Sequence, residues 1–206
     1  MGGHLAGEVA STLVSRYVIE HFFDHSPFLD DESIHAWISS LLLTANDLVN
    51  KESDMHSEYA GMGTTIVICY MDGKNTYVSH VGDSRAYLYK DTLKQITADD
   101  TFVNELVKRG LINEEEASHH PKRNVLVQAI GIKEALRISF YKIEEDYRAI
   151  LLCSDGLYNS LSSQQIEEIL QKNASVDQKT ECLIQSANEF GGLDNIGVLL
   201  IEKGEA

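Results

Sequence analysis

Two aspartates at the ends of apolar runs suggest the first chemistry in this sequence. Asp155 follows the run 148–154, and Asp194 precedes the run 196–201. A carboxylate at the end of one buried strand and a second at the start of another can meet at one edge of a sheet. Paired carboxylate oxygens are hard ligands that suit Mg²⁺ or Mn²⁺. The pattern therefore predicts a site for divalent metal ions.

A third aspartate strengthens this interpretation. Asp83 ends another strand-like run, in the sequence 81–85. An Asp-Gly pair by itself is more often a turn than a ligand, because both residues favour turns for backbone reasons. Carboxylates that cluster inside a fold, however, must be neutralised by cations or protons. We expect Asp83, Asp155 and Asp194 to form one carboxylate cluster that binds metal.

The first part of the chain is predicted to form two helices followed by a β-hairpin. Apolar residues recur at helical spacing within 5–23 and again within 34–49, which predicts two amphipathic helices. Runs rich in β-branched and aromatic residues follow at 65–70 and 76–81. They predict a hairpin that turns around Asp72 and Gly73. A third strand is expected over 85–89, directly after Asp83.

The second part begins with a polar, helical segment, 99–124, in which Asn113 and Glu116 form a capping box. We expect this segment to be a movable cover. Strands are expected near Leu126 and over 136–143 and 149–153, helices over 163–171 and 178–190, and then a final strand. Helices, antiparallel strands, further helices and a closing strand predict an α+β sandwich in a single domain, 1–206.

Composition excludes several classes of function. With 206 residues, 43% of them apolar, the chain is large enough for one domain with a core. Its 17 basic and 32 acidic residues give a net charge of −15, which repels nucleic acids and anionic lipids. Cys69, Cys153 and Cys182 form neither a disulfide pattern nor a zinc motif. Without a signal peptide or a membrane-spanning run, a cytoplasmic location is expected.

Several motifs in the expected order resemble those of the metal-dependent protein phosphatase 2C family, in the bacterial branch that opposes serine/threonine kinases. The motifs are Gly82-Asp83-Ser84-Arg85-Ala86-Tyr87, Ser154-Asp155-Gly156-Leu157, Gly191-Gly192-Leu193-Asp194-Asn195, Gly61-Met62-Gly63-Thr64-Thr65, Asn104-Glu105-Leu106-Val107 and His120-Pro121-Lys122-Arg123-Asn124. The similarity runs from the first residue to the last strand.

This resemblance implies a four-layer α-β-β-α sandwich of two antiparallel sheets flanked by helix pairs. It makes Asp155 and Asp194 ligands of a pair of Mg²⁺ or Mn²⁺ ions, and Asp83 a ligand of a third, more loosely held ion. A water activated by the metals attacks phosphoserine or phosphothreonine, so no side chain acts as the nucleophile. The segment 99–124 becomes the flap, which influences the choice of phosphoprotein substrate.

The sequence departs from the family at its start. Members carry Asp-Gly-Met-Gly-Gly-His, in which the aspartate bridges both metals, whereas this chain begins Met1-Gly2-Gly3-His4. The bridging aspartate and the arginine that binds the substrate phosphate would precede residue 1. We therefore expect an N-terminally truncated domain with little phosphatase activity. The alternative is a catalytically inactive module of the same fold that recognises phosphoproteins or a kinase.

Other residues have simpler interpretations. His119 and His120 are adjacent, and adjacent residues on a helix point in different directions, so a polar patch is favoured over a metal pair. Ser84 and Ser154 lack the surroundings of a nucleophilic serine and are interpreted as small residues beside the metal cluster. Arg123 is interpreted as an exposed arginine, although a contact with a phosphopeptide stays open. A third possible function is that of a sporulation or stress-type relative, which dephosphorylates an anti-sigma antagonist. The flap segment argues against it, because such a segment is typical of members that oppose kinases.

Overall fold

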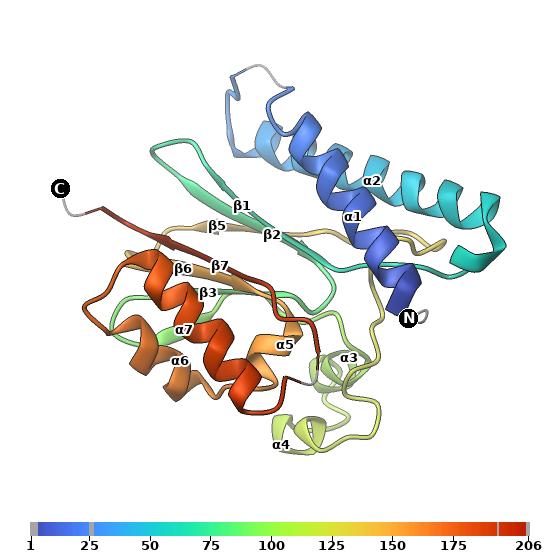
Figure 1. The fold of residues 1–206 in the computed structure, drawn as a ribbon. Coiled ribbons are helices and arrows are strands. Elements are labelled where there is room, and N and C mark those ends of the chain that lie inside the picture. Colours follow the sequence, from blue (N-terminus) through green and yellow to red (C-terminus); the bar gives the residue numbers. More distant parts are fainter. Residues whose placement is uncertain (1–3, 25–26, 193, 205–206) are drawn as a thin grey trace. The chain divides into compact units, whose positions relative to one another are not determined.

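The computed structural model describes residues 4–24, 27–192 and 194–204 (Figure 1). The start of the predicted motif at Met1-Gly2-Gly3, and Leu193 in the Asp194 motif, lie outside these residues. The described residues divide into two compact units. The first contains residues up to 68 together with 79–82 and 100–140, and the second contains 69–78, 83–99 and the residues from 141 onward.

The second unit holds a four-stranded antiparallel sheet with the order β4-β3-β6-β7. Its strands are β3 (Arg85–Tyr89), β4 (Leu93–Gln95), β6 (Ala149–Cys153) and β7 (Val198–Glu202). β6 is buried along its whole length, as expected for an apolar run at the centre of a sheet. The predicted bounds of β3 and β6 are confirmed.

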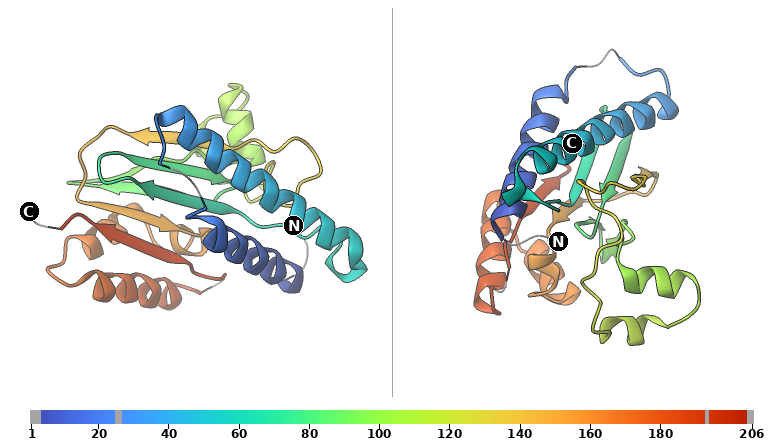
Figure 2. Two further views of the ribbon diagram at one scale, coloured as in Figure 1. Left: turned by 90° about the horizontal axis from the view of Figure 1, so that it is seen from above. Right: turned by 90° about the vertical axis from the view of Figure 1, so that its right-hand side faces the viewer.

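Helices cover one face of this sheet. They are α5 (Asp155–Tyr158), α6 (Ser163–Leu170) and α7 (Val176–Glu189). Ser162 and Ser175 each cap the helix that follows, in capping boxes with Gln165 and Gln178. Leu151 packs with residues of α5, α6 and α7 in one apolar core. Figure 2 shows α6 and α7 side by side along the sheet.

A second sheet has three strands in the order β1-β2-β5. They are β1 (Ile66–Met71), β2 (Thr76–Val81) and β5 (Ser139–Ile143). β1 and β2 form the predicted hairpin. Its turn is held by Asp72, whose Oδ1 accepts the N–H groups of Lys74 at 2.8 Å and Asn75 at 2.7 Å. Gly73 has φ +86°, a conformation that favours glycine.

The first unit begins with the two predicted helices, α1 (His4–His21) and α2 (Asp31–Met55), and a short 3₁₀ turn, η1 (Ser57–Tyr59). Asp30 caps α2 in a capping box with Ser33. The apolar face of α2 is buried, including Ile38 and Leu42. Trp37 packs against the rings of Phe22 and Phe28, at centroid distances of 5.2 and 5.1 Å.

The same unit holds two helices of the flap segment, α3 (Phe102–Lys108) and α4 (Glu114–Ser118). The predicted capping box between Asn113 and Glu116 is confirmed at the start of α4. The description of residues 99–124 as a flap, and of 1–206 as a single domain, stays a prediction.

The α+β prediction of two antiparallel sheets with flanking helices is confirmed. The strand predicted near Leu126 is wrong, because that residue forms only an isolated bridge with Thr101. The strand expected over 136–143 begins at Ser139. The sequence prediction also missed β4 and α5, which are short elements of three and four residues.

A buried amide on α2 tests how this unit is held together. Asn46 is 7% exposed, its Oδ1 accepts the Gly131 N–H at 2.7 Å, and its Nδ2 donates to the Ile132 carbonyl at 3.2 Å. Asn46→Ala should lower the free energy of unfolding by about 1–2 kcal/mol, because it removes both hydrogen bonds. Urea unfolding measures this loss. The exposed control Asn173→Ala should change stability by less than about 0.5 kcal/mol, and equal effects would contradict the prediction.

Candidate active site

Strand register brings the three predicted aspartates to one end of the four-stranded sheet. Arg85 of β3 pairs with Cys153 of β6, and Cys153 pairs with Val198 of β7. Asp83 precedes Arg85 by two residues, Asp155 follows Cys153 by two, and Asp194 precedes Val198 by four. Because neighbouring strands are antiparallel, the start of β3, the end of β6 and the start of β7 lie at the same edge of the sheet.

Electrostatics show that these carboxylates influence one another. The pKa of Asp83 is raised to about 6, first by partial burial and then by the negative charges of Asp155 and Asp99. The pKa of Asp155 is also raised, first by burial and then by the charge of Asp194. Asp155 therefore interacts electrostatically with both of the other aspartates. Asp194 itself is exposed.

The donor set suits a hard divalent cation. Two partly buried carboxylates with raised pKa values are stabilised by a bound positive charge, and oxygen ligands favour Mg²⁺ or Mn²⁺. Within the part of the chain that the structure describes, no group of three or more His, Cys, Asp or Glu side chains is close enough to hold a metal ion. The assignment of all three aspartates as metal ligands stays a prediction.

Ser154 fastens the segment after Asp194 to the start of α5. Its Oγ donates to the Asn195 carbonyl at 3.0 Å and accepts the Gly197 N–H at 2.8 Å. Its backbone N–H donates to the Gly197 carbonyl at 3.0 Å. These bonds hold together the two loops that carry Asp155 and Asp194. The hydroxyl is engaged in positioning, which agrees with its interpretation as a small residue beside the site.

Gly156 allows these two loops to approach closely. A Cβ atom at this position would lie 2.4 Å from the Asn195 carbonyl oxygen and 3.0 Å from its carbonyl carbon. Both atoms belong to the backbone and cannot swing away as a flexible side chain would. The glycine that follows Asp155 is therefore required by packing against the loop that contains Asp194.

A network around Arg85 supports the turn that contains Asp83. The Arg85 guanidinium donates to both carboxylate oxygens of Asp99, at 2.7–3.1 Å, and to the Tyr87 hydroxyl at 3.1 Å. It also lies 3.5 Å from the centre of the Tyr158 ring. The Tyr158 hydroxyl in turn donates to the Asp83 carbonyl at 3.0 Å. This network ties the Asp83 turn to the end of α5.

Sequence reasoning missed the roles of Asp99 and Tyr158. Arg85 was part of a recognised motif, but its partners come from distant segments that no local pattern identifies. Arg85 has a raised pKa although burial opposes it, because Asp99 accepts its hydrogen bonds. The pKa of Tyr158 is raised first by burial and then by the charge of Asp83.

The histidines of the flap segment lie in a polar patch. His119 Nδ1 is 2.8 Å from Ser118 Oγ and 3.0 Å from the Glu115 carbonyl oxygen. His120 Nδ1 accepts the Lys122 N–H at 3.1 Å. Local hydrogen bonds thus engage Nδ1 of both rings, which agrees with the interpretation of these residues as a polar patch. Arg123 is exposed.

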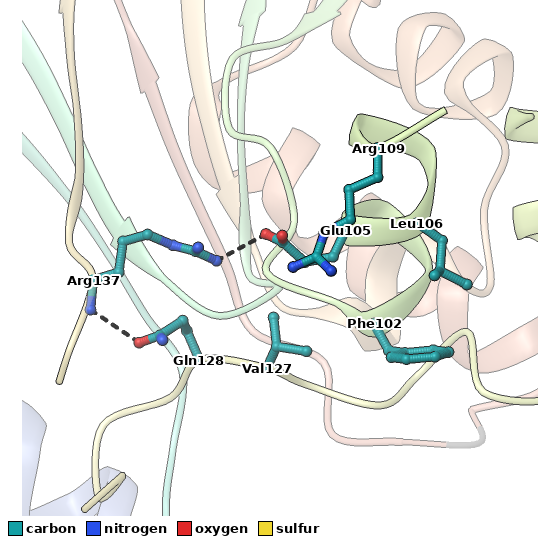
Figure 3. Close-up of a pocket in the computed structure, with 7 residues that line it drawn as sticks. All are labelled: Phe102, Glu105, Leu106, Arg109, Val127, Gln128 and Arg137. Atoms are coloured by element: carbon teal, nitrogen blue, oxygen red, sulfur yellow. Dashed lines mark hydrogen bonds and ion pairs between the residues drawn. The ribbon is translucent and has the colours of Figure 1, made fainter. Parts of the chain in front are cut away.

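A pocket of about 280 Å³ lies beside α3 in the first unit (Figure 3). Its lining residues are Phe102, Glu105, Leu106, Arg109, Val127, Gln128 and Arg137. The pocket combines apolar side chains with two arginines, one of which forms an ion pair with Glu105.

Comparison with known proteins identifies the family. The sequence profile described as "Protein phosphatase 2C" matches residues 1–188. The chain belongs to the protein phosphatase 2C family. In the part that the structure describes, no helix is long and apolar enough to cross a membrane.

Its relatives include named bacterial phosphatases. The serine/threonine phosphatase stp of Listeria welshimeri is 35% identical over 205 residues, which cover 98% of this chain and 81% of the relative. Protein phosphatase PhpP of Streptococcus pneumoniae is 36% identical over 210 residues, covering 100% of this chain and 83% of PhpP.

Solved structures show the same fold. The structure of Stp1 from Staphylococcus aureus has a TM-score of 0.90 and 31% identity, with 100% of this chain and 81% of Stp1 covered. The catalytic domain of the phosphatase PstP, solved with two manganese ions, has a TM-score of 0.80 and 36% identity, with 97% of this chain and 83% of that domain covered.

Substitution of Gly156 tests the close approach of the two loops. Gly156→Ala should lower the free energy of unfolding by about 2–3 kcal/mol, because its Cβ would collide with backbone atoms of Asn195. The control Gly7→Ala, in α1, has no atom within 4 Å of the added Cβ and should be neutral or slightly stabilising. Thermal and urea unfolding measure both changes. A tolerated Gly156→Ala would show that the loops are not in contact.

The cost of the buried carboxylate can be measured without metal. In EDTA at neutral pH, Asp83→Asn should raise the free energy of unfolding by roughly 1–2 kcal/mol, allowing for partial exposure, because the ionised group is disfavoured there. Addition of Mn²⁺ should stabilise the parent more than the variant. Asp47→Asn, on the exposed face of α2, is the control and should change little in either condition. Destabilisation by Asp83→Asn in EDTA would contradict the electrostatic argument.

Proposed function

We propose that this protein hydrolyses phosphoserine and phosphothreonine in proteins with the help of bound Mg²⁺ or Mn²⁺. The observation that carries the proposal is the register of β3, β6 and β7, which sets Asp83, Asp155 and Asp194 at one sheet edge. Membership of the protein phosphatase 2C family supports it. The manganese ions in the related PstP structure support the choice of metal.

Each aspartate has a proposed place in the site. Asp155, whose pKa responds to Asp194 and which in turn raises that of Asp83, is the central ligand. Asp194 completes the tighter pair of ions, and Asp83 serves a third, more loosely held ion. When bound, the ions would supply a water of lowered pKa and positive charge for the phosphoryl oxygens.

The protein's own groups hold these ligands in place and provide no nucleophile. Ser154 Oγ is bonded to the loop after Asp194, so it is engaged in structure. The Arg85 guanidinium is bonded to Asp99 and stacked on Tyr158, so it orders the Asp83 turn and is not available to grip a substrate phosphate. Binding of the substrate phosphate is therefore assigned to the metals and to groups other than Arg85.

The proposed substrates are phosphorylated proteins, and a serine/threonine kinase must supply them, because that is the chemistry that forms phosphoserine and phosphothreonine. We assign the protein to signalling in the bacterial cytoplasm. Its three cysteines are all unpaired, which is typical of a reducing compartment. Its net charge of −15 disfavours nucleic acid and anionic membranes as partners.

One observation favours the rival function, a catalytically inactive module that binds phosphoproteins. Among the described residues no group of three or more potential metal ligands is close enough to hold an ion. A module of this kind would bind a phosphopeptide without metal. Retention of Asp83 and Asp155 in a setting that raises the pKa of both favours the enzyme, because a binding module gains nothing from carboxylates that are disfavoured in this way.

Metal binding and turnover, measured side by side, decide between the two functions. Calorimetry with Mn²⁺ and hydrolysis of a phosphothreonine peptide in excess Mn²⁺ are the measurements. Asp155→Asn and Asp194→Asn should each lower Mn²⁺ affinity at least about tenfold and abolish any turnover, whereas Asp83→Asn should weaken both. Asp47→Asn should match the parent.

Three results are informative. Loss of Mn²⁺ affinity in the Asp155 and Asp194 variants, with turnover in the parent, supports the enzyme. Phosphopeptide binding in EDTA without turnover in Mn²⁺ supports the inactive module. Unchanged Mn²⁺ affinity and turnover in Asp194→Asn would remove Asp194 from the site.

A further inference from the structure

Arg137 joins two carboxylates in the first unit. Its Nη2 lies 3.3 Å from Oδ1 of Asp100. The same atom lies 3.0 Å from Oε1 of Glu105, which belongs to α3; Figure 3 shows this second contact. Its backbone N–H donates to Gln128 Oε1 at 2.9 Å. The guanidinium therefore connects the flap helix α3 to the segment that leads into it.

Asp100 holds both polar backbone groups of one glycine. Its Oδ2 accepts the Gly82 N–H at 3.1 Å, and its own N–H donates to the Gly82 carbonyl at 3.0 Å. The Asp100 carbonyl accepts the Val127 N–H at 2.8 Å. Gly82, which directly precedes Asp83, is thus fixed by a single residue that Arg137 contacts.

The geometry at Gly82 leaves little freedom. Its φ is +102°, and an added Cβ would lie 2.4 Å from the Thr65 methyl group. Only glycine fits such a backbone conformation in contact with a neighbouring chain segment. The direction in which the chain leaves β2 and enters the Asp83 turn is therefore set by the bonds to Asp100.

The Asp100 carboxylate depends on a positive partner. Its side chain is 2% exposed, whereas that of Arg137 is 50% exposed. His80 Nε2 lies 3.9 Å from Oδ2, farther than a hydrogen bond. Removing the arginine would leave a buried carboxylate without its closest cation, which is strongly unfavourable. The carboxylate would then turn or draw in water, at the expense of its bond to Gly82.

We propose that Arg137 is a positioning residue: by holding Asp100 it fixes Gly82, the residue bonded directly to Asp83, and by holding Glu105 it links Gly82 to α3. The metal-ligand role of Asp83 in this inference rests on the proposed function. No sequence motif pointed to Arg137, because its partners are 37 and 32 residues away.

The amide of Gly82 reports directly on this link. Hydrogen exchange of single amides, followed by NMR in EDTA, should be about tenfold faster at Gly82 in Arg137→Met than in the parent. Arg137→Lys keeps the charge and should restore much of the protection. Glu105→Gln, which weakens only the bond to α3, should have a smaller effect. The control Arg148→Met, which removes an exposed ion pair with Asp91 at 3.5 Å, should leave Gly82 unchanged.

Exchange at Leu151, in the core of the other sheet, separates a local effect from loss of stability. Faster exchange at Gly82 with unchanged exchange at Leu151 supports the proposal. Unchanged exchange at Gly82 in Arg137→Met overturns it. Equal acceleration at both amides also overturns it, because Arg137 would then contribute only general stability.

Mn²⁺ affinity tests the consequence for the metal. Arg137→Met should raise the dissociation constant about threefold to tenfold, less than is usual for groups that touch a ligand directly, and should add no further loss in an Asp83→Asn background. An equal loss in both backgrounds would show that Arg137 does not act through Asp83. If Asp83→Asn alone leaves Mn²⁺ affinity unchanged, the metal role of Asp83 fails, while the exchange of Gly82 still decides whether Arg137 holds the turn.

Discussion

Repulsion between carboxylates at one sheet edge is the constraint on which the site depends. The antiparallel register places Asp83, Asp155 and Asp194 at the same end of β3, β6 and β7. Burial raises the pKa values of Asp83 and Asp155, and a neighbouring carboxylate raises each further: Asp155 for Asp83, and Asp194 for Asp155. A fold gains nothing from this arrangement unless a cation offsets the repulsion. Raised pKa values of this origin are concentrated at functional sites, which supports the proposed metal site.

The surrounding contacts hold together the loops that carry these carboxylates. Ser154 bonds the loop after Asp194 to the start of α5, and Gly156 lets the two backbones touch. Arg85 and Tyr158 brace the Asp83 turn through Asp99 and through the Asp83 carbonyl. On the side of the first unit, Asp100 holds Gly82. Small residues, hydrogen bonds to the backbone and the ion pair between Arg85 and Asp99 thus do the positioning.

Periodicity predicted the long elements well, because burial of a continuous apolar face dominates their stability. The helices α1, α2 and α7 lie where helical spacing predicted them, and β3 and β6 have the predicted bounds. The elements that the sequence analysis missed are short. β4 has three residues, lies at the edge of its sheet beside β3, and has its Leu93 N–H bonded to Glu167 of α6. The run near Leu126 forms a single β-bridge, with Thr101, and no strand. Local patterns carry no signal for such elements, because their partners are distant.

The sequence by itself determined the family, the two-sheet α+β class and the three candidate ligands, because apolar periodicity and short motifs are local properties of the chain. Only the tertiary structure decided which side chains support the site. Tyr158 reaches the Asp83 carbonyl across 75 residues, and Arg137 reaches Asp100 across 37. These contacts depend on strand register and on the packing of loops, and residues that meet only after folding leave no spacing for a sequence pattern to detect.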